Sequence, residues 1–206
     1  MAQRPVFYLE DDVICTKNVT FEWAPGFAIS QKKKNVARLH EKLDGKALEV
    51  STKGNDVLGL RLSAFNLKLD GKPLESVFQS SKVFENGGPY FDLLNVSPRE
   101  AKRDPRLRES GPLVKFCYGG CNWPLVPKSL FYDYIYYNAV MESIPEDELE
   151  ALLDYKYFSD IEFNPERSIN TQARAVAIVQ YVLKKYGTMQ VYSPRRFLIL
   201  HREIVK

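Results

Sequence analysis

The first part of the chain alternates apolar and polar positions, and this pattern predicts extended structure over residues 1–29. The alternation is clearest in Thr20–Trp23, and Pro25-Gly26 indicates a turn. Apolar residues then recur at helical spacing from Ser30, a candidate N-cap, to Leu43. We therefore expect an N-terminal extended region that packs on the rest of the domain, followed by an amphipathic helix.

The middle of the chain predicts short strands and one conspicuous helix. Residues 47–50 and 59–65 have the composition of strands, and Asp70-Gly71 is a strong tight-turn signal. A helix is expected over residues 73–84, because a proline suits its first turn and Gly87-Gly88-Pro89 closes it.

The rest of the chain adds mainly helices. In chain order, we expect a capping-box helix from Ser97, irregular structure over 111–121, helices over 128–141 and from Pro145, extended or irregular structure over 157–163, a helix from Asn170 or Thr171 to Gly187, and a last strand over 196–201. No internal repeat and no Pro/Gly-rich linker divides the sequence. The predicted fold class is therefore α+β with helices dominant, in a single compact domain over residues 1–206.

The net charge argues against one class of function. The 206 residues carry a net charge of +3, which gives no domain-wide basic field. A protein that coats nucleic acid by charge alone is therefore not expected. Local basic clusters occur at residues 32–34, 99–108 and 195–196. Each is either a solvated face or a track for phosphate groups.

Cysteine and histidine usage argues against a metal site. The chain has three cysteines, Cys15, Cys117 and Cys121, and two histidines, His40 and His201. Cys117-x-x-x-Cys121 is not a usual zinc pair, so we expect no metal and no cofactor. No signal peptide opens the sequence, and no run approaches the ~18 apolar residues of a membrane span. We expect a cytoplasmic location with free thiols.

Three polar residues point to possible chemistry on the helix over 73–84. Glu75, Gln79 and Lys82 stand at i, i+4 and i+7, which places them within roughly 40° of one another around a helix. Val77 and Phe78 lie on the other side. A lysine in such a place can be a nucleophile if burial lowers its pKa, because the neutral amine attacks electrophilic carbon. The alternative is an exposed stripe on a solvated face.

Two further groups of polar residues have equally open interpretations. Asp160, Glu162 and Asn164 alternate with apolar residues, and a period of two would put them on one face of a strand, whether at a site or merely in water. Asp133 is a second candidate carboxylate, which lies either in the site or on a helix surface. Walker, Rossmann and nucleophile-elbow signatures are missing from the sequence.

Several motifs together carry a resemblance to a known family. They are Leu62-Ser63-Ala64-Phe65-Asn66, Leu69-x-Gly71, Leu74-Glu75-Ser76-Val77-Phe78-Gln79-Ser80-Ser81-Lys82, Ser97-Pro98-Arg99-Glu100-Ala101-Lys102, Trp123 before the Asp133 helix, and Glu162-Phe163-Asn164-Pro165. In this order and spacing the chain resembles the NADAR family, and most closely the branch encoded beside DarT-type toxins. One departure is that Ser76 and Val77 follow Glu75 where many members have His and an aromatic residue.

The resemblance implies a specific activity and specific partners. NADAR proteins of this branch are ADP-ribosylglycohydrolases that remove ADP-ribose from guanine bases of DNA. The DarT-type toxin adds that group to DNA from NAD, and the NADAR protein is the antitoxin. The substrate would be ADP-ribosylated DNA, and the toxin would be encoded nearby.

The resemblance also implies roles for individual residues. Lys82 would be catalytic, capturing the anomeric carbon, and Glu75 would be its electrostatic or acid/base partner. Gln79, Ser63, Asn66, Glu162 and Asn164 would line the ADP-ribose site, Trp123 or a tyrosine would stack on a base, Asp133 would be a second carboxylate, and the basic residues 99–108 would meet DNA or the diphosphate. The alternatives are a non-catalytic module that binds ADP-ribose or NAD metabolites, a protein that neutralises its toxin by contact, or a hydrolase of another nucleotide N-glycoside.

Overall fold

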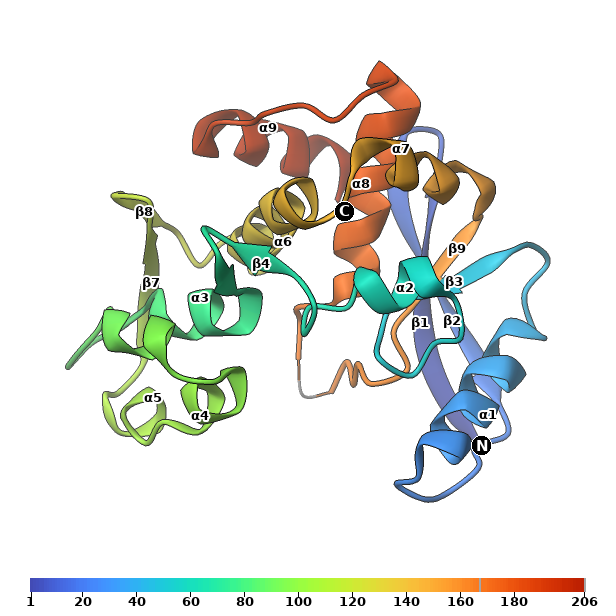
Figure 1. Cartoon of the computed structure of the whole chain (residues 1–206), viewed down its shortest axis with the longest axis horizontal. Coiled ribbons are helices and arrows are strands. Elements are labelled where there is room, and N and C mark those ends of the chain that lie inside the picture. The colour runs from blue at the N-terminus through green and yellow to red at the C-terminus, as the bar shows by residue number, and fades with distance from the viewer. Residues whose placement is uncertain (167, 206) are drawn as a thin grey trace.

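A four-stranded sheet lies on one side of the molecule in the computed structural model, which describes residues 1–166 and 168–205 (Figure 1). Its strand order is β2 (Val13–Phe21), β1 (Ala2–Glu10), β9 (Tyr157–Ser159) and β3 (Ala47–Glu49). β1 pairs antiparallel with β2 and with β9, whereas β3 and β9 are parallel. The extended N-terminal region is thus confirmed as a hairpin.

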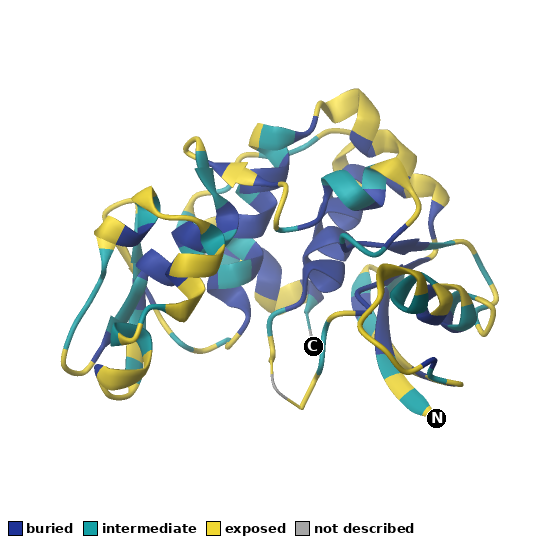
Figure 2. Cartoon of the chain, turned by 60° about the horizontal axis from the view of Figure 1, so that its bottom comes forward, coloured by how far each residue is buried: buried dark blue, intermediate teal, exposed yellow. Residues whose placement is uncertain are grey.

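The two faces of this sheet are buried by different helices. Val6 and Phe7 are neighbours in β1, so their side chains point to opposite faces. Val6 belongs to a core cluster that includes Val36 and Leu39 of α1 (Ile29–His40), the helix expected from Ser30. Phe7 belongs to the larger core, which includes most of α8 (Gln172–Tyr186). Figure 2 shows α6 and α8 as the most deeply buried helices.

A second region lies on the opposite side of α6 (Leu130–Ser143) and is built around a three-stranded sheet (Figure 1). Its elements are β6 (Lys82–Phe84), β7 (Leu113–Tyr118), β8 (Cys121–Trp123), the hairpin of β4 (Lys68–Leu69) and β5 (Lys72–Pro73), and the helices α3 (Leu74–Ser80), η1 (Phe91–Asn95), α4 (Pro98–Arg103) and α5 (Arg106–Glu109). The larger core includes Phe116 of β7 and Phe158 of β9. Because one core cluster includes residues of both regions, we keep a single domain over 1–206 as our proposal.

Several local predictions are confirmed by their hydrogen bonds or dihedral angles. Ser97 caps α4 in a capping box with Glu100. Asp70 and Gly71 have φ angles of 52° and 69° in the β4–β5 turn, and Gly187 ends α8 with a φ of 72°. Helices also occur at α6 and at α7 (Glu146–Leu149), which η2 (Glu150–Asp154) follows. The predicted fold class, α+β with helices dominant, is confirmed.

Two predictions in the second region are wrong, namely the end of α3 and the irregular structure of residues 111–121. The helix ends at Ser80 rather than Phe84, because the chain then enters β6 and pairs with β7. The hydroxyls of Ser80 and Ser81 both donate to the carbonyl of Val77, which satisfies an acceptor at the helix end. The segment expected to be irregular, 111–121, contains β7 and the start of β8. Its tight turn is Gly119-Gly120, whose φ angles are 57° and 72°.

Two segments expected to be strands are helices. The first is α2 (Val57–Arg61), which Asp56 caps by accepting a hydrogen bond from the backbone of Leu58. A Cβ on Gly59 would lie 2.2 Å from the carbonyl oxygen of Glu49, so glycine permits the close approach of α2 to β3. The second is α9 (Pro194–Ile204), whose N-cap is Ser193. The described residues contain no helix both long and apolar enough to span a bilayer.

Candidate functional site

Glu75, Gln79 and Lys82 form a hydrogen-bonded row beside α3. Lys82 Nζ donates to Gln79 Oε1 over 2.7 Å, and Gln79 Nε2 donates to Glu75 Oε1 over 2.7 Å. The structure therefore brings the three side chains together as their spacing predicts, although Lys82 reaches them from β6 and not from the helix. Gln79 is only 4% exposed, so the alternative of a solvated stripe is wrong.

Partial burial changes the pKa of the Lys82 amine. Its Nζ lies 4.9 Å from the centre of the Phe78 ring. This burial lowers the pKa of Lys82, the negative charge of Glu75 opposes the shift, and the positive charge of Lys102 adds to it. Lys102 Nζ lies 3.7 Å from Glu75 Oε1, so it also partly neutralises that carboxylate. The neutral, nucleophilic form of Lys82 is thereby favoured relative to an exposed lysine.

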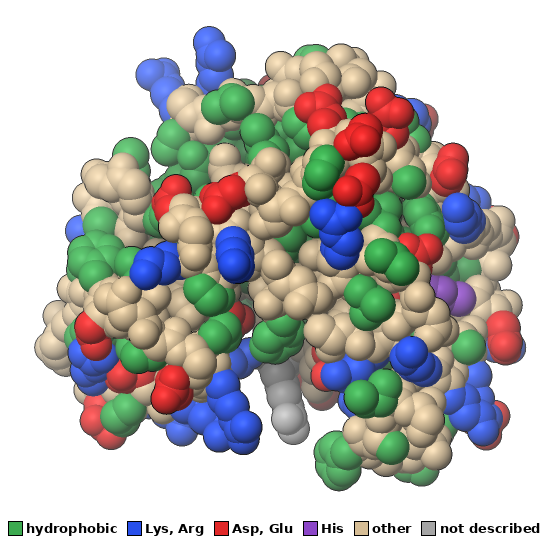
Figure 3. Space-filling model, in the orientation of Figure 1, with side chains coloured by type: hydrophobic (Ala, Val, Ile, Leu, Met, Phe, Trp, Pro, Cys, Tyr) green, Lys and Arg blue, Asp and Glu red, His purple; other side chains and the backbone are tan. Residues whose placement is uncertain are grey.

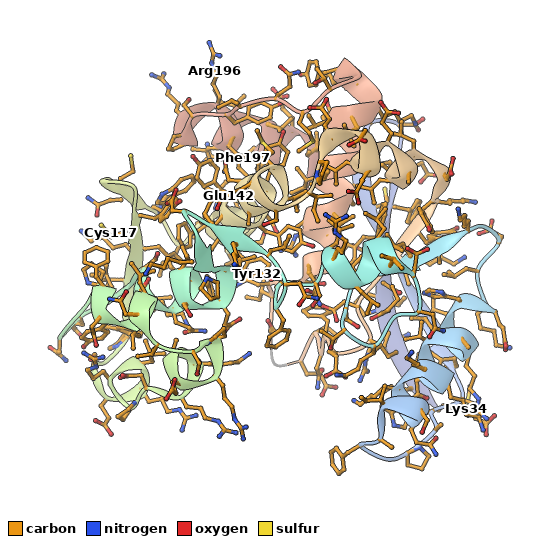
Figure 4. The ribbon with its side chains drawn as sticks, in the orientation of Figure 1. Lys34, Cys117, Tyr132, Glu142, Arg196 and Phe197 are labelled. Carbon is orange, nitrogen blue, oxygen red and sulfur yellow. The ribbon has the colours of Figure 1, made fainter. Side chains whose placement is uncertain are left out.

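Tyr132 links this row to a second polar group. Its ring packs edge-on against Phe78 with 5.4 Å between the ring centres, and Figure 4 shows it near the middle of the molecule. Burial raises the pKa of Tyr132 well above its ordinary value, and the negative charges of Glu75 and Asp160 add to the effect. Its phenol therefore stays protonated and lies within the electrostatic reach of both carboxylates.

Asp160 and Glu49 form a buried pair of carboxyl groups. Glu49 accepts hydrogen bonds from the hydroxyl of Ser51 at 2.5 Å, the hydroxyl of Ser159 at 2.6 Å and the backbone of Ile161 at 2.8 Å. Burial, followed by the charge of Glu49, raises the pKa of Asp160 to about 8. Burial raises the pKa of Glu49 as well, so the pair as a whole holds a proton more readily than exposed carboxyl groups do.

A pocket of about 340 Å³ opens beside this pair. Its lining residues are Ser51, Thr52, Lys53, Ser63, Phe65, Glu162 and Gln172. The hydroxyl of Ser63 is buried and has no hydrogen-bond partner among the described residues, so a bound molecule can satisfy it. Hydroxyls and a lysine amine are suited to ribose hydroxyls and phosphate oxygens. Ser63 and Glu162, both predicted from the sequence, thus lie at one cavity.

The other predicted pocket residues make contacts of their own. Asn66 donates to the carbonyl of Leu60 and so supports the end of α2. Asn164 accepts a hydrogen bond from the backbone of Glu166 within a turn. The predicted alternating strand through Asp160, Glu162 and Asn164 is wrong, because β9 ends before it and Asp160 is buried while Glu162 is exposed.

Asp133 and Trp123 are core residues. Asp133 is fully buried and pairs with Arg174 through bonds of 3.0 and 3.1 Å and with His201 at 2.9 Å, so the helix-surface alternative is wrong. Burial raises the pKa of Asp133, but Arg174 and His201 outweigh it and lower that pKa overall. Trp123 is 2% exposed and packs 4.4 Å from the ring of Tyr134, so its face is not free to stack on a base.

Sequence reasoning did not assign Tyr132, Glu49 or Gln172 to the site. Tyr132 directly precedes Asp133, and the helical pattern through α6 gave no reason to prefer either. Gln172 begins α8, and its side-chain oxygen accepts from the backbone of Ala64 beside Ser63. Glu49 stands in an otherwise apolar strand, and a charged residue there is the one available signal.

The region around α4 is positively charged. Arg99, Lys102 and Arg103 are exposed on it, and α4 packs against α3. Figure 3 shows Lys and Arg side chains gathered at the lower edge of the molecule, beside an indentation between the two regions. Arg106 is different, because it is paired with Asp92 and Asp104. Among the described residues, no group of three or more His, Cys, Asp or Glu side chains is placed to hold a metal ion.

A family model described as DarT1-associated NADAR antitoxin matches residues 2–205. The chain belongs to the NADAR family. Its family description assigns it the role of an antitoxin and implies a DarT-type toxin as its partner. No curated protein matched the chain. Within this NADAR protein, the residues that the family resemblance marks as catalytic, Lys82 and Glu75, are the two ends of the hydrogen-bonded row.

Proposed function

We propose that this NADAR protein is an ADP-ribosylglycohydrolase that removes ADP-ribose from guanine bases of DNA and so reverses the action of its toxin. The observation that carries the proposal is the Glu75–Gln79–Lys82 row, in which a half-buried lysine has a lowered pKa. A surface lysine would be almost wholly protonated at neutral pH and would be a poor nucleophile.

The proposed reaction proceeds in two displacements. The lone pair of Lys82 Nζ attacks the anomeric carbon of the ribose, the bond from that carbon to the guanine amine breaks, and the departing amine takes up a proton. Water then attacks the same carbon and gives up a proton, and Lys82 leaves as an amine. The products are ADP-ribose and unmodified guanine. Glu75, held through Gln79, stabilises the positive charge that develops at Lys82 and the anomeric carbon.

Two surfaces support the proposed substrate. The pocket beside Ser63 offers hydroxyls and the amine of Lys53 to the ribose and diphosphate. The exposed basic residues of α4, Arg99 and Arg103, lie on the helix next to α3 and can meet a DNA backbone. Asn66 and Asn164 remain proposed substrate contacts, because Asn66 uses only its side-chain nitrogen and Asn164 only its side-chain oxygen in their present hydrogen bonds.

The test is release of ADP-ribose from an oligonucleotide that carries ADP-ribosylated guanine. We expect the unaltered protein to release it and Lys82→Ala to lose at least about a hundredfold in rate. Lys128→Ala, which removes an exposed lysine before α6, is the matched control. A folded Lys82→Ala protein with unchanged turnover would refute the catalytic role of the row.

A further inference from the structure

One wall of the pocket beside Ser63 is an exposed aromatic ring. Phe65 lines that pocket and is 63% exposed, and it is the one aromatic side chain among the described residues that line it. Single exposed apolar side chains are common on protein surfaces and need no explanation. Phe65 differs because it belongs to a concave site whose other described lining residues are all polar. A flat apolar face among polar side chains suits a ligand that combines a flat ring with polar groups.

The backbone that carries Phe65 is held on both sides of this residue. Before it, the backbone N–H of Ala64 donates to Gln172 Oε1 over 2.8 Å. After it, the backbone N–H of Asn66 donates to the carbonyl of Ser63 over 2.8 Å, and the Asn66 side chain donates to a carbonyl of α2 over 2.7 Å. The turn is therefore fixed in the absence of a ligand, while the ring itself is left exposed. Such preorganisation lowers the entropic cost of binding.

A series of aromatic rings connects the pocket to the proposed nucleophile. Lys82 Nζ lies 4.9 Å from the ring centre of Phe78, which lies 5.4 Å from the ring centre of Tyr132. The ring of Tyr132 lies 6.1 Å from that of Tyr136, whose hydroxyl donates to the carbonyl of Leu62, directly before a pocket residue. Lys82 is not among the described lining residues. The pocket is thus separate from the lysine but only a few side chains away from it.

The chemistry of ADP-ribose decides which part of the substrate reaches this pocket. The reacting anomeric carbon is at one end of the molecule and adenine is at the other, with the diphosphate between the two riboses. Guanine leaves from the anomeric carbon, so it lies beside Lys82 in the proposed reaction. A pocket separate from Lys82 therefore receives the adenosine end. Trp123, the aromatic residue that the sequence favoured for base stacking, is only 2% exposed and cannot take this role.

We propose that Phe65 stacks on the adenine of ADP-ribose and so makes the pocket specific for the adenosine end of the substrate. This inference rests on the proposed function. The ring covers one face of the adenine, while the hydroxyls of the pocket and the amine of Lys53 meet the adjoining ribose and diphosphate. Because adenine is remote from the reacting carbon, the stack is the same in the ground state and the transition state. Its loss should therefore raise KM and leave kcat unchanged.

Binding of free ADP-ribose tests the stack without turnover. Calorimetric titration should show that Phe65→Ala and Phe65→Leu each bind about tenfold more weakly than the unaltered protein. Phe65→Tyr, which keeps an aromatic face, should bind within about threefold of it. Phe27→Ala removes a fully exposed phenylalanine before α1 and is the matched control. Phe65 is exposed, so chemical denaturation should show that each variant is as stable as the unaltered protein.

Phe65→Trp adds a spectroscopic readout of the same contact. An indole that stacks on adenine loses fluorescence, so the emission of this variant should fall as ADP-ribose is added. Phe27→Trp, which adds an exposed indole outside the pocket, should show no such fall. On the modified oligonucleotide, Phe65→Ala should raise KM about tenfold and change kcat by less than about twofold.

The outcomes separate this inference from the function on which it rests. Equal affinity of Phe65→Ala or Phe65→Leu and the unaltered protein for ADP-ribose overturns the stack while the glycohydrolase stands. A loss on the modified oligonucleotide without a loss on free ADP-ribose assigns the ring to a DNA base and also overturns it, as does failure of the unaltered protein to bind ADP-ribose. Absence of turnover refutes the proposed function, and the titration of ADP-ribose still decides the stack.

Discussion

Lys82 reaches Glu75 through an amide, because the side chain of Gln79 accepts from Lys82 and donates to Glu75 with both bonds at 2.7 Å. This arrangement keeps the carboxylate close enough to oppose the lowering of the pKa of Lys82 by burial, while the Gln79 oxygen accepts an N–H of the amine. The amide also orients Lys82, since Gln79 is buried within α3. The reactivity of Lys82 therefore depends on two side chains one helical turn apart.

Glu75→Gln should move the pH dependence of kcat/KM in a stated direction. Burial lowers the pKa of Lys82 and Glu75 opposes that shift, so loss of the carboxylate lowers the pKa further. The limb on which activity rises with deprotonation of Lys82 should move to lower pH. Rates measured across the pH range test this, with Glu109→Gln as an exposed control. A limb that stays in place or moves to higher pH would contradict the role of Glu75.

Asp133→Asn should destabilise the fold. Asp133 is fully buried between Arg174 and His201, and breaking such a pair costs about 3–5 kcal/mol. Chemical denaturation should show that loss, whereas Glu203→Gln on the surface of α9 should change the free energy of unfolding by less than about 0.5 kcal/mol. Unchanged stability of Asp133→Asn would mean that the network contributes nothing.

The same carboxyl predicts a pH dependence of stability. The pKa of Asp133 is lowered in the folded state, so its contribution is present above the unfolded pKa of about 3.9 and is lost as the pH falls through the folded value. The difference in stability between the unaltered protein and Asp133→Asn should therefore shrink in acid.

The fold was predictable where local signals were complete. The capping box at Ser97 and the turn at Asp70-Gly71 appear as predicted, because each is decided by residues within one turn. The end of α3 was missed, because pairing of β6 with β7 outweighs the helical spacing through Phe84. The helix α9 was missed in favour of a strand, although Ser193 and a proline mark its start.

The candidate site was predictable in the same limited way. Helical spacing correctly brought Glu75 and Gln79 together, and it placed Lys82 beside them although Lys82 lies in β6, after the end of α3. The positions of Tyr132 and Asp160 were not predictable from spacing, because they depend on how α6 and the loop after β9 pack against α3 and α8. Asp133 was predicted as a candidate for the site or for a helix surface, but it is an ion-pair partner of Arg174 in the core.

ADP-ribose release should not require a metal ion. The proposed chemistry uses the amine of Lys82 as nucleophile and the carboxylate of Glu75 to stabilise positive charge, and no step forms or breaks a bond to phosphorus. Protein dialysed against EDTA should keep the rate of the untreated sample. Loss of turnover that one divalent ion restores would contradict this prediction.

DNA without the modification should bind weakly. The net charge of +3 releases few counterions, so affinity for plain DNA should be low and its dependence on salt shallow. Folded Lys82→Ala, which prevents turnover, can be titrated with matched oligonucleotides with and without ADP-ribosylated guanine. We expect at least about tenfold tighter binding of the modified strand, since the pocket adds contacts to the ADP-ribose. Equal affinities would mean that the DNA backbone dominates recognition.

The most direct test of the account counts product per protein molecule. ADP-ribosylated guanine oligonucleotide in large excess is incubated with the unaltered protein, with Lys82→Ala and with Lys82→Arg, and free ADP-ribose is measured by chromatography. We predict many equivalents from the unaltered protein and none above background from either variant, because a guanidinium stays protonated and cannot replace a neutral amine. Release by folded Lys82→Arg at the full rate, or no release by the unaltered protein, would contradict the central claim that Lys82 catalyses removal of ADP-ribose.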